Sequence, residues 1–510
     1  MKQKIFMVLS RIFLILMLLS MGFILIVSVQ CFFDVIRTNG VSLGLGILAL
    51  IGLLVLAVLE LYALYRLSRR VKEKHMIWLL FLGSLFLHLL VILFADTPVV
   101  SDFKIQWRAA QQILAQDHSY LSLAYFVNWK NQLGFSIYEA MLASLWNSPY
   151  CIQIVNALWS SLSVLFVFLI GKSLYSMRNA FWAASVYAVS LFPCTYVSVL
   201  TNHIPALALI LLAVWLLLCA PFRHQTVNVV IAGAALACSE LLRPETILIL
   251  VPFIVWQGFV FLKSKGKGMI MVLGSVLLLL GSYAGVLQLG DAAARVSGIA
   301  PQGVKSEDLY YKFLVGLNPH TMGRFSASLI QELEELQETG MSREEAELTL
   351  LQEKRPQGPD QWLRLLSRKS AVFWWERDLS WSLQGLHERY PISQAGSQTL
   401  TLLLGCLDSC QFFWVFLTLF ASWRSLWRSG CAQHRKLFIP CIFFTIFFVY
   451  LWIEVQARYV YIALPFVYIM MAGWNAEKIT SVINKMIQIL RIFYFDRILK
   501  DLHNCYDKCC

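Results

Sequence analysis

The sequence predicts an all-α polytopic membrane protein. Hydrophobic residues make up 58% of the 510 residues and charged residues only 14%, which sets the chain apart from an ordinary soluble domain. The apolar residues form continuous blocks of about 17 to 25, the length that crosses the hydrocarbon core as a helix. They do not alternate with a period of two, as the strands of a membrane β-barrel would. A helical bundle is therefore the expected architecture.

About twelve apolar blocks have a typical spanning length. The first follows Lys2 and Lys4 and resembles a signal peptide, but it is long and lacks a small-residue cleavage site, so we interpret it as a retained anchor. The expected spans are residues 5–29, 42–65, 77–95, 152–171, 180–199, 204–221, 226–241, 246–262, 269–289, 399–421, 437–453 and 459–474.

Short basic loops place the N-terminus in the cytosol. In that orientation five loops rich in Lys and Arg all face the cytoplasm, as the positive-inside rule requires. The formal net charge of +12 is therefore a signal of topology and does not indicate nucleic-acid binding. These loops are residues 66–74, 171–179, 221–224, 263–268 and 423–436.

This topology divides the chain into five regions and gathers the unusual polar groups on the outer face. Helix ends that converge on one face can build one cavity, which is typical of a membrane enzyme that works outside the cytosol. The regions are two additional N-terminal spans (1–76), a membrane core (77–289) with a large first outer loop (96–151), an extracytoplasmic segment (290–398), C-terminal spans (399–474) and a cytoplasmic amphipathic tail (475–510).

The two outer regions are expected to be folded. In the first outer loop, "DFKIQWRAAQQILA" and "SIYEAMLASLW" have apolar residues at helical spacing and are predicted as amphipathic helices in the membrane interface. The extracytoplasmic segment contains two candidate capping boxes, Ser328 with Gln331 and Ser342 with Glu345. The tail mixes basic and apolar residues and is expected to lie on the anionic cytoplasmic leaflet.

Asp102 lies in the stretch "PVVSDFKIQW", where the chain leaves the membrane. An acid in a loop is usually a solvated surface group. Asp102, however, begins an amphipathic segment on the same face as Arg243 and Arg458. A general base next to phosphate-binding cations is chemically reasonable there.

Each of these two arginines has a structural and a functional interpretation. Arg243 lies in a tight turn between two apolar runs, where Glu240 or Glu245 could clamp it or where its guanidinium could bind an anionic substrate. For Arg458, an i, i+4 pair with Glu454 is the structural alternative to a phosphate ligand.

Further outer polar side chains suit a sugar or a polar headgroup, because amides both donate to and accept from hydroxyls. One group is Lys130, Asn131 and Gln132 in "NWKNQLGF", and the other is Asn318, His320 and Arg324 in "GLNPHTMGRF". The alternative for the group in "NWKNQLGF" is a polar turn that ends at Gly134.

Several chemistries lose support from missing motifs. The sequence has no phosphate loop, no Gly-x-Ser-x-Gly elbow and no His-Glu-x-x-His, which argues against ATP-driven transport, serine hydrolysis and zincin chemistry. Cys505, Cys509 and Cys510 cluster in the tail without zinc-finger spacing, so metal binding and lipidation are disfavoured there.

The order of several short motifs resembles the GT-C superfamily of membrane glycosyltransferases, in particular the bacterial relatives of protein O-mannosyltransferases and of the aminoarabinose transferase. The motifs lie between about Ile77 and Trp474. They are "SDF", "NQLGF", "TNHIPA", "LRPE", "GLNPHTMGR" and "ARYVYIALP".

The resemblance implies an inverting transfer of a sugar from a polyprenyl-phosphate carrier to an acceptor hydroxyl of a glycan, lipid or protein. The site would face away from the cytosol of a bacterial plasma membrane. Asp102 would be the general base, and Arg243, Arg458 and, more weakly, Lys130 would stabilise the lipid phosphate. The sugar and the acceptor would be bound by Asn131, Gln132, Asn202, His203, Glu245, Asn318 and Arg324.

One departure from the resemblance concerns metal binding. Relatives often carry a second acid in the short outer turn where this chain has Asn202 and His203. We therefore expect neither a metal nor another cofactor. Two other classes stay open: a polyprenyl-linked saccharide transporter or flippase, which should have polar groups through the midplane and repeated halves, and a noncatalytic membrane scaffold.

Overall fold

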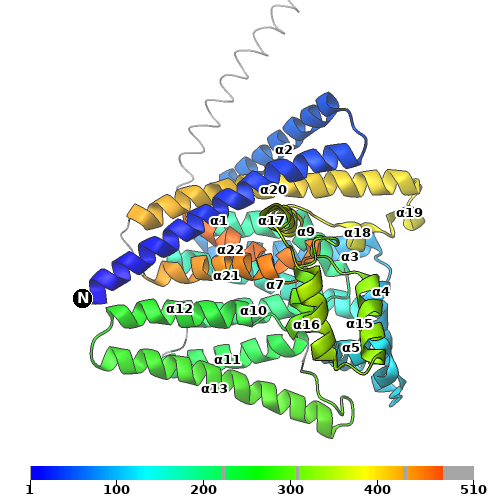
Figure 1. Cartoon of the computed structure of the whole chain (residues 1–510). Coiled ribbons are helices and arrows are strands. Elements are labelled where there is room, and N and C mark those ends of the chain that lie inside the picture. Colours follow the sequence, from blue (N-terminus) through cyan, green and yellow to red (C-terminus); the bar gives the residue numbers. More distant parts are fainter. Residues whose placement is uncertain (1, 221, 223, 306–308, 429–433, 475–510) are drawn as a thin grey trace, which may run out of the picture.

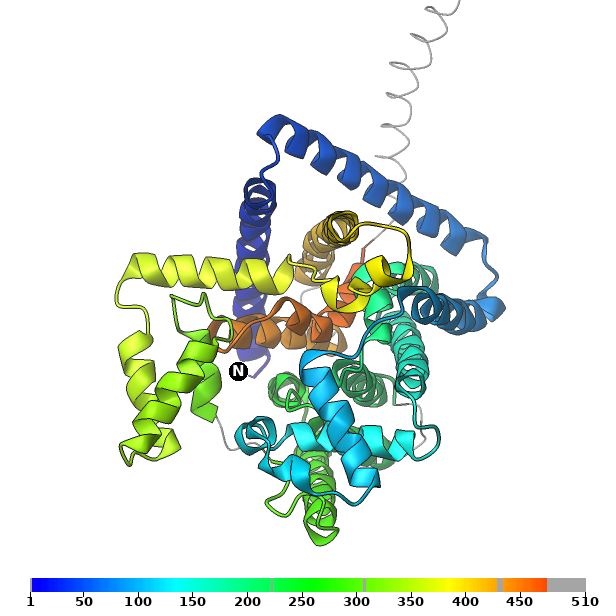
Figure 2. The same cartoon turned by 90° about the vertical axis from the view of Figure 1, so that its right-hand side faces the viewer.

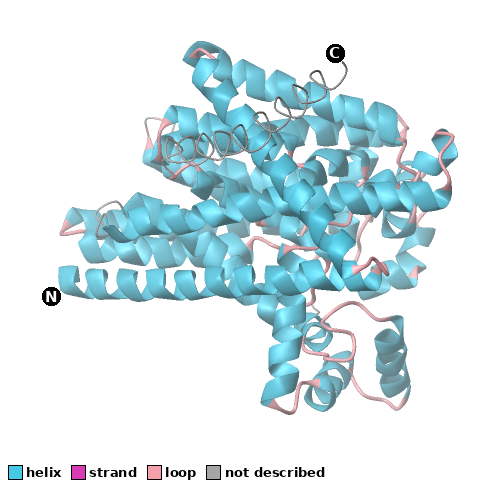
Figure 3. Cartoon of the chain, turned by 90° about the horizontal axis from the view of Figure 1, so that it is seen from above, coloured by secondary structure: helices cyan, strands magenta, loops and turns pink. Residues whose placement is uncertain are grey.

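The computed structural model describes residues 2–220, 222, 224–305, 309–428 and 434–474. Across these residues it is a bundle of helices without strands (Figure 3). The expected all-α polytopic fold is thereby confirmed. The predicted amphipathic tail and Cys505, Cys509 and Cys510 lie outside the described residues.

The helices follow in an order that matches the expected spans and outer segments. They are α1 (Lys2–Thr38), α2 (Leu43–Arg70), α3 (Glu73–Ala95), α4 (Ser101–Leu114), η1 (Ser119–Ser122), α5 (Ala124–Asn128), α6 (Gln132–Ala143), α7 (Pro149–Leu174), α8 (Met177–Val189), α9 (Leu191–Thr195), η2 (Tyr196–Ser198), α10 (His203–Cys219), α11 (Gln225–Leu242), α12 (Ile247–Lys263), α13 (Lys267–Val296), α14 (Leu309–Gly316), α15 (Ala327–Glu338), α16 (Arg343–Lys354), α17 (Pro359–Trp374), α18 (Ser380–Leu383), α19 (Leu386–Arg389), α20 (Gln394–Arg428), η3 (His434–Leu437), α21 (Phe438–Trp452), η4 (Ala457–Ile462) and α22 (Leu464–Met471).

Each of the twelve expected spans falls on one of these elements. Among the described residues, eight helices are long and apolar enough to cross a membrane, and α8 with α9 and η2 forms a ninth that is bent by 57°. Three shorter apolar helices, α10, α12 and the η4–α22 pair, complete the set. The exact number of twelve stays a prediction because these three are shorter than a typical span.

Several predicted spans are shorter than the helices that contain them. The first span was expected at 5–29, but α1 runs from Lys2 to Thr38, and α20 extends well beyond 399–421. The hydrophobic pattern marks only the part of a helix in hydrocarbon, whereas backbone hydrogen bonding continues into the polar ends.

The helices of the two outer regions gather at one end of the bundle. Figure 1 shows α4, α5, α15 and α16 at the right-hand end of the spans, and Figure 2 looks onto that end. The two regions are joined by Arg343, whose Nη1 donates to Asn128 Oδ1 at 2.7 Å. One of the two expected capping boxes is present, at Ser342 and Glu345. The other is absent, because α15 begins after Ser326 and places Ser328 inside the helix.

A buried lysine attaches the outer segment to the bundle. Lys369 of α17 has no exposed surface, and its Nζ donates to the carbonyls of Gly316 (2.7 Å) and Leu451 (2.9 Å) at the C-terminal ends of α14 and α21. A cation is favourable where helix carbonyls lack partners. Gly316 is required at this contact, since a Cβ there would lie 2.3 Å from the carbonyl carbon of Ile453.

Close packing also fixes the first outer loop. Gly134 does not end a turn, as one alternative supposed, but lies inside α6. A Cβ at this position would lie 1.8 Å from the carbonyl oxygen of Leu241 in α11. The absence of a side chain therefore lets α6 rest directly on the end of α11, next to Arg243.

Candidate active site

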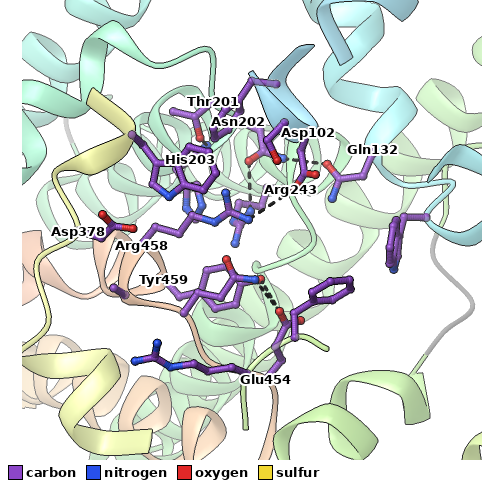
Figure 4. Close-up of a pocket in the computed structure, with 18 of the residues that line it drawn as sticks. Asp102, Gln132, Thr201, Asn202, His203, Arg243, Asp378, Glu454, Arg458 and Tyr459 are labelled. Atoms are coloured by element: carbon purple, nitrogen blue, oxygen red, sulfur yellow. Dashed lines mark hydrogen bonds and ion pairs between the residues drawn. The ribbon is translucent and has the colours of Figure 1, made fainter. Parts of the chain in front are cut away.

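A cavity of about 740 Å³ lies at the outer end of the bundle, where the first outer loop, the extracytoplasmic segment and several helix ends meet (Figure 4). It brings together residues that are far apart in the sequence. Its lining includes Asp102, Gln132, Asn202, His203, Arg243, Arg324 and Arg458 from the predicted set, with Gln106, Tyr125, Trp129, Tyr311, Lys312, Asp378, Trp381, Glu454 and Tyr459 as further members.

Asp102 lies in the first turn of α4, and 43% of its side chain is exposed. The chain reaches this turn through Thr97, whose hydroxyl donates to the carbonyl of Ser382 at 2.6 Å. Ser101 then adopts a left-handed backbone conformation (φ 53°), so the chain turns sharply into α4. A carboxylate at this position is exposed to the cavity and can accept a proton from a bound hydroxyl.

Arg458 lies beside Asp102 and has unused hydrogen-bonding capacity. Its Nη2 is 3.7 Å from Asp102 Oδ2, and only 16% of its side chain is exposed. The guanidinium lies 5.8 Å from the ring centres of Phe103 and Trp381. Its Nε has no hydrogen-bond partner within the part of the chain that the structure describes. Buried N–H groups without partners are costly, which is typical of a site that awaits an anion.

The alternative pair of Arg458 with Glu454 is absent from the structure. Glu454 Oε2 instead accepts from Lys312 Nζ at 2.5 Å, and its Oε1 accepts from Gln456 Nε2 at 2.7 Å. Burial opposes the ionisation of Glu454, but the charge of Lys312 and the hydrogen bonds from Lys312 and Gln456 together outweigh it and hold the pKa of this carboxyl below its ordinary value. Glu454 is therefore occupied, and Arg458 stays available.

Arg243 combines the two interpretations that the sequence left open. Its Nε lies 2.7 Å from Glu245 Oε1, so the clamp exists, whereas Glu240 accepts from Thr246 instead. Its Nη1 donates to Asn202 Oδ1 at 3.2 Å, and its guanidinium lies 5.2 Å from the ring centre of Tyr459. The clamped guanidinium still lines the cavity.

A short chain of amides connects this arginine to the first outer loop. Gln132 Oε1 accepts from Gln106 Nε2 at 2.7 Å and from Asn202 Nδ2 at 3.4 Å. Asn202 also donates to the carbonyl of Leu242 at 3.1 Å. The sequence prediction included Gln132 and Asn202 but missed Gln106, whose role could have been suspected only from its place one turn after Asp102.

His203 is buried against the same cavity. It lies about 6 Å from the ring centres of Tyr196, Tyr459 and Tyr461. Its Nδ1 lacks a hydrogen-bond partner among the described residues.

A second cavity of about 480 Å³ adjoins the first. The wall between them is formed by residues that line both, among them Arg243, Lys312, Glu454 and Tyr459. Asn131 and Glu245, two predicted sugar-binding residues, lie in this second cavity.

Three other predicted residues are placed differently. Lys130 is half-buried and lines neither cavity. Asn318 also lines neither, and its Oδ1 accepts from the backbone N–H of His320 at 2.9 Å, which shapes a turn. Arg324 lines the first cavity, where it makes a bidentate pair with Glu376 at 2.6 and 2.7 Å.

Lys312 is the cation that sequence reasoning missed. It lies on α14, lines both cavities and bonds to Glu454, so the extracytoplasmic segment contributes directly to the site. No motif surrounds it, and only the fold places it here. Among the described residues, no group of three or more His, Cys, Asp or Glu side chains is arranged to hold a metal ion. The predicted independence from metals stays a prediction.

Comparison with known proteins identifies part of this chain. Residues 131–284, from the end of the first outer loop into α13, match the family model described as dolichyl-phosphate-mannose-protein mannosyltransferase. The match confirms, for that part, the resemblance to the GT-C superfamily of membrane glycosyltransferases. No curated protein sequence matches the chain.

Two solved structures show a distant similarity to this chain. The first is the archaeal oligosaccharyltransferase AglB from Archaeoglobus fulgidus in complex with an inhibitory peptide and a dolichol-phosphate. Its TM-score is 0.42 at 14% identity, over 82% of this chain and 52% of that one. The second is an oligosaccharyltransferase of Archaeoglobus fulgidus in the apo form, with a TM-score of 0.44 at 14% identity, over 85% and 52%. This chain spans about half the length of those proteins.

Proposed function

We propose that this protein is an inverting glycosyltransferase that moves a sugar, of the hexosyl class, from a polyprenyl-phosphate carrier to an acceptor hydroxyl. The reaction takes place on the extracytoplasmic face of the plasma membrane. The observation that carries the proposal is the pairing of Asp102 with the underused Arg458 in one cavity, opposite Arg243.

The chemical step uses Asp102 as the general base. Its carboxylate takes the proton of the acceptor hydroxyl while the oxygen attacks the anomeric carbon of the donor sugar. The bond between that carbon and the phosphate oxygen breaks, and polyprenyl phosphate leaves with the electron pair. The products are an inverted glycoside and polyprenyl phosphate. Such a positioned base contributes about 10²- to 10⁴-fold.

Arg458 is the principal phosphate ligand in this proposal. The other cations of the cavity have carboxylate partners at close range: Arg243 has Glu245 at 2.7 Å, Lys312 has Glu454 at 2.5 Å and Arg324 has Glu376 at 2.6 Å. Arg458 has only Asp102 at 3.7 Å. It can therefore give its donors to the leaving phosphate in the transition state without first losing a tight partner.

The remaining polar groups suit the sugar. Gln106, Gln132 and Asn202 offer amides along one side of the cavity. Trp129 and Tyr311 provide aromatic rings on which a sugar face can pack.

The test uses cells that lack this protein and are restored with the native chain, Asp102→Asn or Asp360→Asn. Asp360 is the matched control because its side chain is 86% exposed on α17. Mass spectrometry measures the polyprenyl-phosphate-linked sugar and the surface glycans. We expect the native chain and Asp360→Asn to clear the accumulated donor and to restore a glycan residue, and Asp102→Asn to do neither. Equal restoration by Asp102→Asn would overturn the assignment.

A further inference from the structure

A third cavity, of about 180 Å³, opens between the outer ends of α1 and α20, away from the amide side of the site. Its two long sides are apolar or small side chains, Phe32 and Val35 from α1 and Leu402 and Cys406 from α20. The charged residues Glu376, Arg377 and Asp378 also line it, and Arg377 is paired with Asp408. Both helices are long and apolar enough to span the membrane. We call this cavity the α1–α20 groove.

The groove borders the lipid. Phe33 on α1 is 50% exposed, and on α20 Leu402 and Leu403 are 37% and 48% exposed. Large apolar side chains on membrane-spanning helices meet hydrocarbon when they do not meet protein. A lipid chain can therefore reach the groove from the bilayer without crossing water.

The inner end of the groove lies next to the main cavity. Glu376 and Asp378 line both. In Figure 4, Asp378 lies near Arg458, on the side away from Asp102. A molecule whose chain occupied the groove would thus present its head to the residues that carry out the transfer.

The charges at this inner end determine which kind of lipid head group can bind there. Glu376 is bound by Arg324, and Arg368 lies 3.5 Å from it. Asp378 accepts from the backbone N–H (3.0 Å) and the hydroxyl of Ser380 and has no cationic partner among the described residues. A carboxylate without a counterion repels a phosphate but accepts hydrogen bonds from hydroxyl groups.

We propose that the α1–α20 groove admits the hydrocarbon chain of a membrane-anchored acceptor, whose hydroxylated head passes Asp378 to reach Asp102. This proposal rests on the proposed function and specifies its acceptor class: the acceptor is a lipid or a lipid-linked glycan rather than a protein. The first N-terminal helix, α1, then serves the reaction, because it forms one wall of the acceptor path.

The first experiment identifies the acceptor fraction. The purified full chain is incubated with membranes from cells that lack it and that have accumulated the donor. The membranes are then separated into material soluble in organic solvent and a delipidated protein pellet, and mass spectrometry locates the added sugar. We expect it in the lipid fraction. Sugar found only in the protein pellet would overturn the lipid acceptor.

The second experiment blocks the groove. Leu402→Trp fills it, whereas Leu403→Trp, one residue further on the same helix and outside the groove, is the matched control. We expect Leu402→Trp to reduce transfer at least tenfold and Leu403→Trp to leave it near the native rate. A polyprenyl phosphate that bears a photoreactive group should label both variants as it labels the native chain. Loss of labelling in Leu402→Trp alone would assign the groove to the donor and refute the proposal.

These outcomes separate the two proposals. If Asp102→Asn stops transfer while Leu402→Trp does not affect it, the acceptor path is wrong and the proposed function stands. If Asp102→Asn transfers sugar as the native chain does, the proposed function itself fails.

Discussion

Arg377 and Arg458 are two buried arginines at the outer end of the bundle, and they differ in how completely their bonds are used. Arg377 has no exposed side-chain surface. Its Nε donates to Asp408 at 3.0 Å, and its Nη1 donates to the carbonyls of Trp374 and Glu376. Arg458 lies 3.7 Å from Asp102 and 5.8 Å from the ring centres of Phe103 and Trp381, and its Nε has no hydrogen-bond partner within the described residues.

The difference distinguishes a structural cation from a functional one. Asp408 also accepts from the hydroxyl of Ser190 at 2.9 Å, just where α8 gives way to α9, so the Arg377 pair holds the bent span to α20. Arg377 Nη2 also lacks a hydrogen-bond partner among the described residues, but its charge is already neutralised at 3.0 Å by Asp408, and a ligand would have to break that pair. Arg458 needs a ligand to satisfy its donors. Removal of the first should therefore affect stability, and removal of the second should affect transfer.

The largest effect is expected from Asp408→Asn. The substitution leaves the charge of Arg377 buried without a counterion, which costs about 3–5 kcal/mol. Thermal unfolding of the purified chain in detergent should show a large drop in midpoint. The double change Arg377→Met with Asp408→Leu should restore much of the loss, because it removes both charges. An unchanged midpoint in Asp408→Asn would show that the pair is not structural.

Arg458→Gln tests the other side of the contrast. We expect the rate of transfer to fall about 10²- to 10³-fold, the usual effect of removing one donor from a developing anion, with a nearly native unfolding midpoint. Arg458→Lys should recover part of the rate, since it keeps the charge but loses the planar fork. A reduced unfolding midpoint with an unchanged transfer rate per folded molecule would show that Arg458 has a structural role, as Arg377 does.

Asn202→Asp should have a smaller effect on the same site. The new carboxylate would stand where Asn202 Oδ1 now accepts from Arg243 at 3.2 Å, so it would partly neutralise that guanidinium. We expect the KM for the polyprenyl-linked donor to rise by about five- to tenfold, which corresponds to about 1 kcal/mol. Asn202→Ser, which adds no charge, is the control and should raise the KM less.

Lys369 is a third buried basic residue, and its side chain has only backbone carbonyls as partners. We expect the smallest effect from this residue, on the pH dependence of stability. Burial lowers the pKa of Lys369 from 10.5 to about 7. Between these values the unfolded chain holds a proton that the folded chain releases, so the stability contributed by this site rises as the pH increases from about 7 to 10.5. As the pH rises over this range, the unfolding midpoint of the native chain should therefore increase relative to that of Lys369→Met. Parallel curves for the two chains would contradict the assignment.

The sequence alone was enough to predict the helical bundle, its spans and the convergence of Asp102, Arg243 and Arg458. Hydrophobic length and loop charge determine which residues leave the membrane on which side, and helix ends on one side have little room to lie apart. Gln132 and Asn202 also lie near these groups, because the first outer loop and the turn before α10 end on the same side of the bundle.

The partners of these residues could not be predicted. The spacing of Glu454 and Arg458 allows an i, i+4 pair, one of the two alternatives for Arg458, but the chain is extended at that point and Glu454 meets Lys312, 142 positions away. Lys312, Lys369 and Asp378 reach the site or support it through the fold of the extracytoplasmic segment. No local pattern records such distant contacts. Asn318, by contrast, makes a local contact with the backbone of His320, and its predicted role as a ligand stays a prediction.

The contact at Gly134 has a consequence for how proteins of this design could diversify. A methyl group there would collide with the backbone of Leu241, so in a saturation library that position should accept almost no replacement. Neighbours such as Lys130 and Trp129 have no such backbone constraint. New substrate preferences could therefore arise by exchange of side chains in the first outer loop, while the backbone of that loop stays fixed on α11.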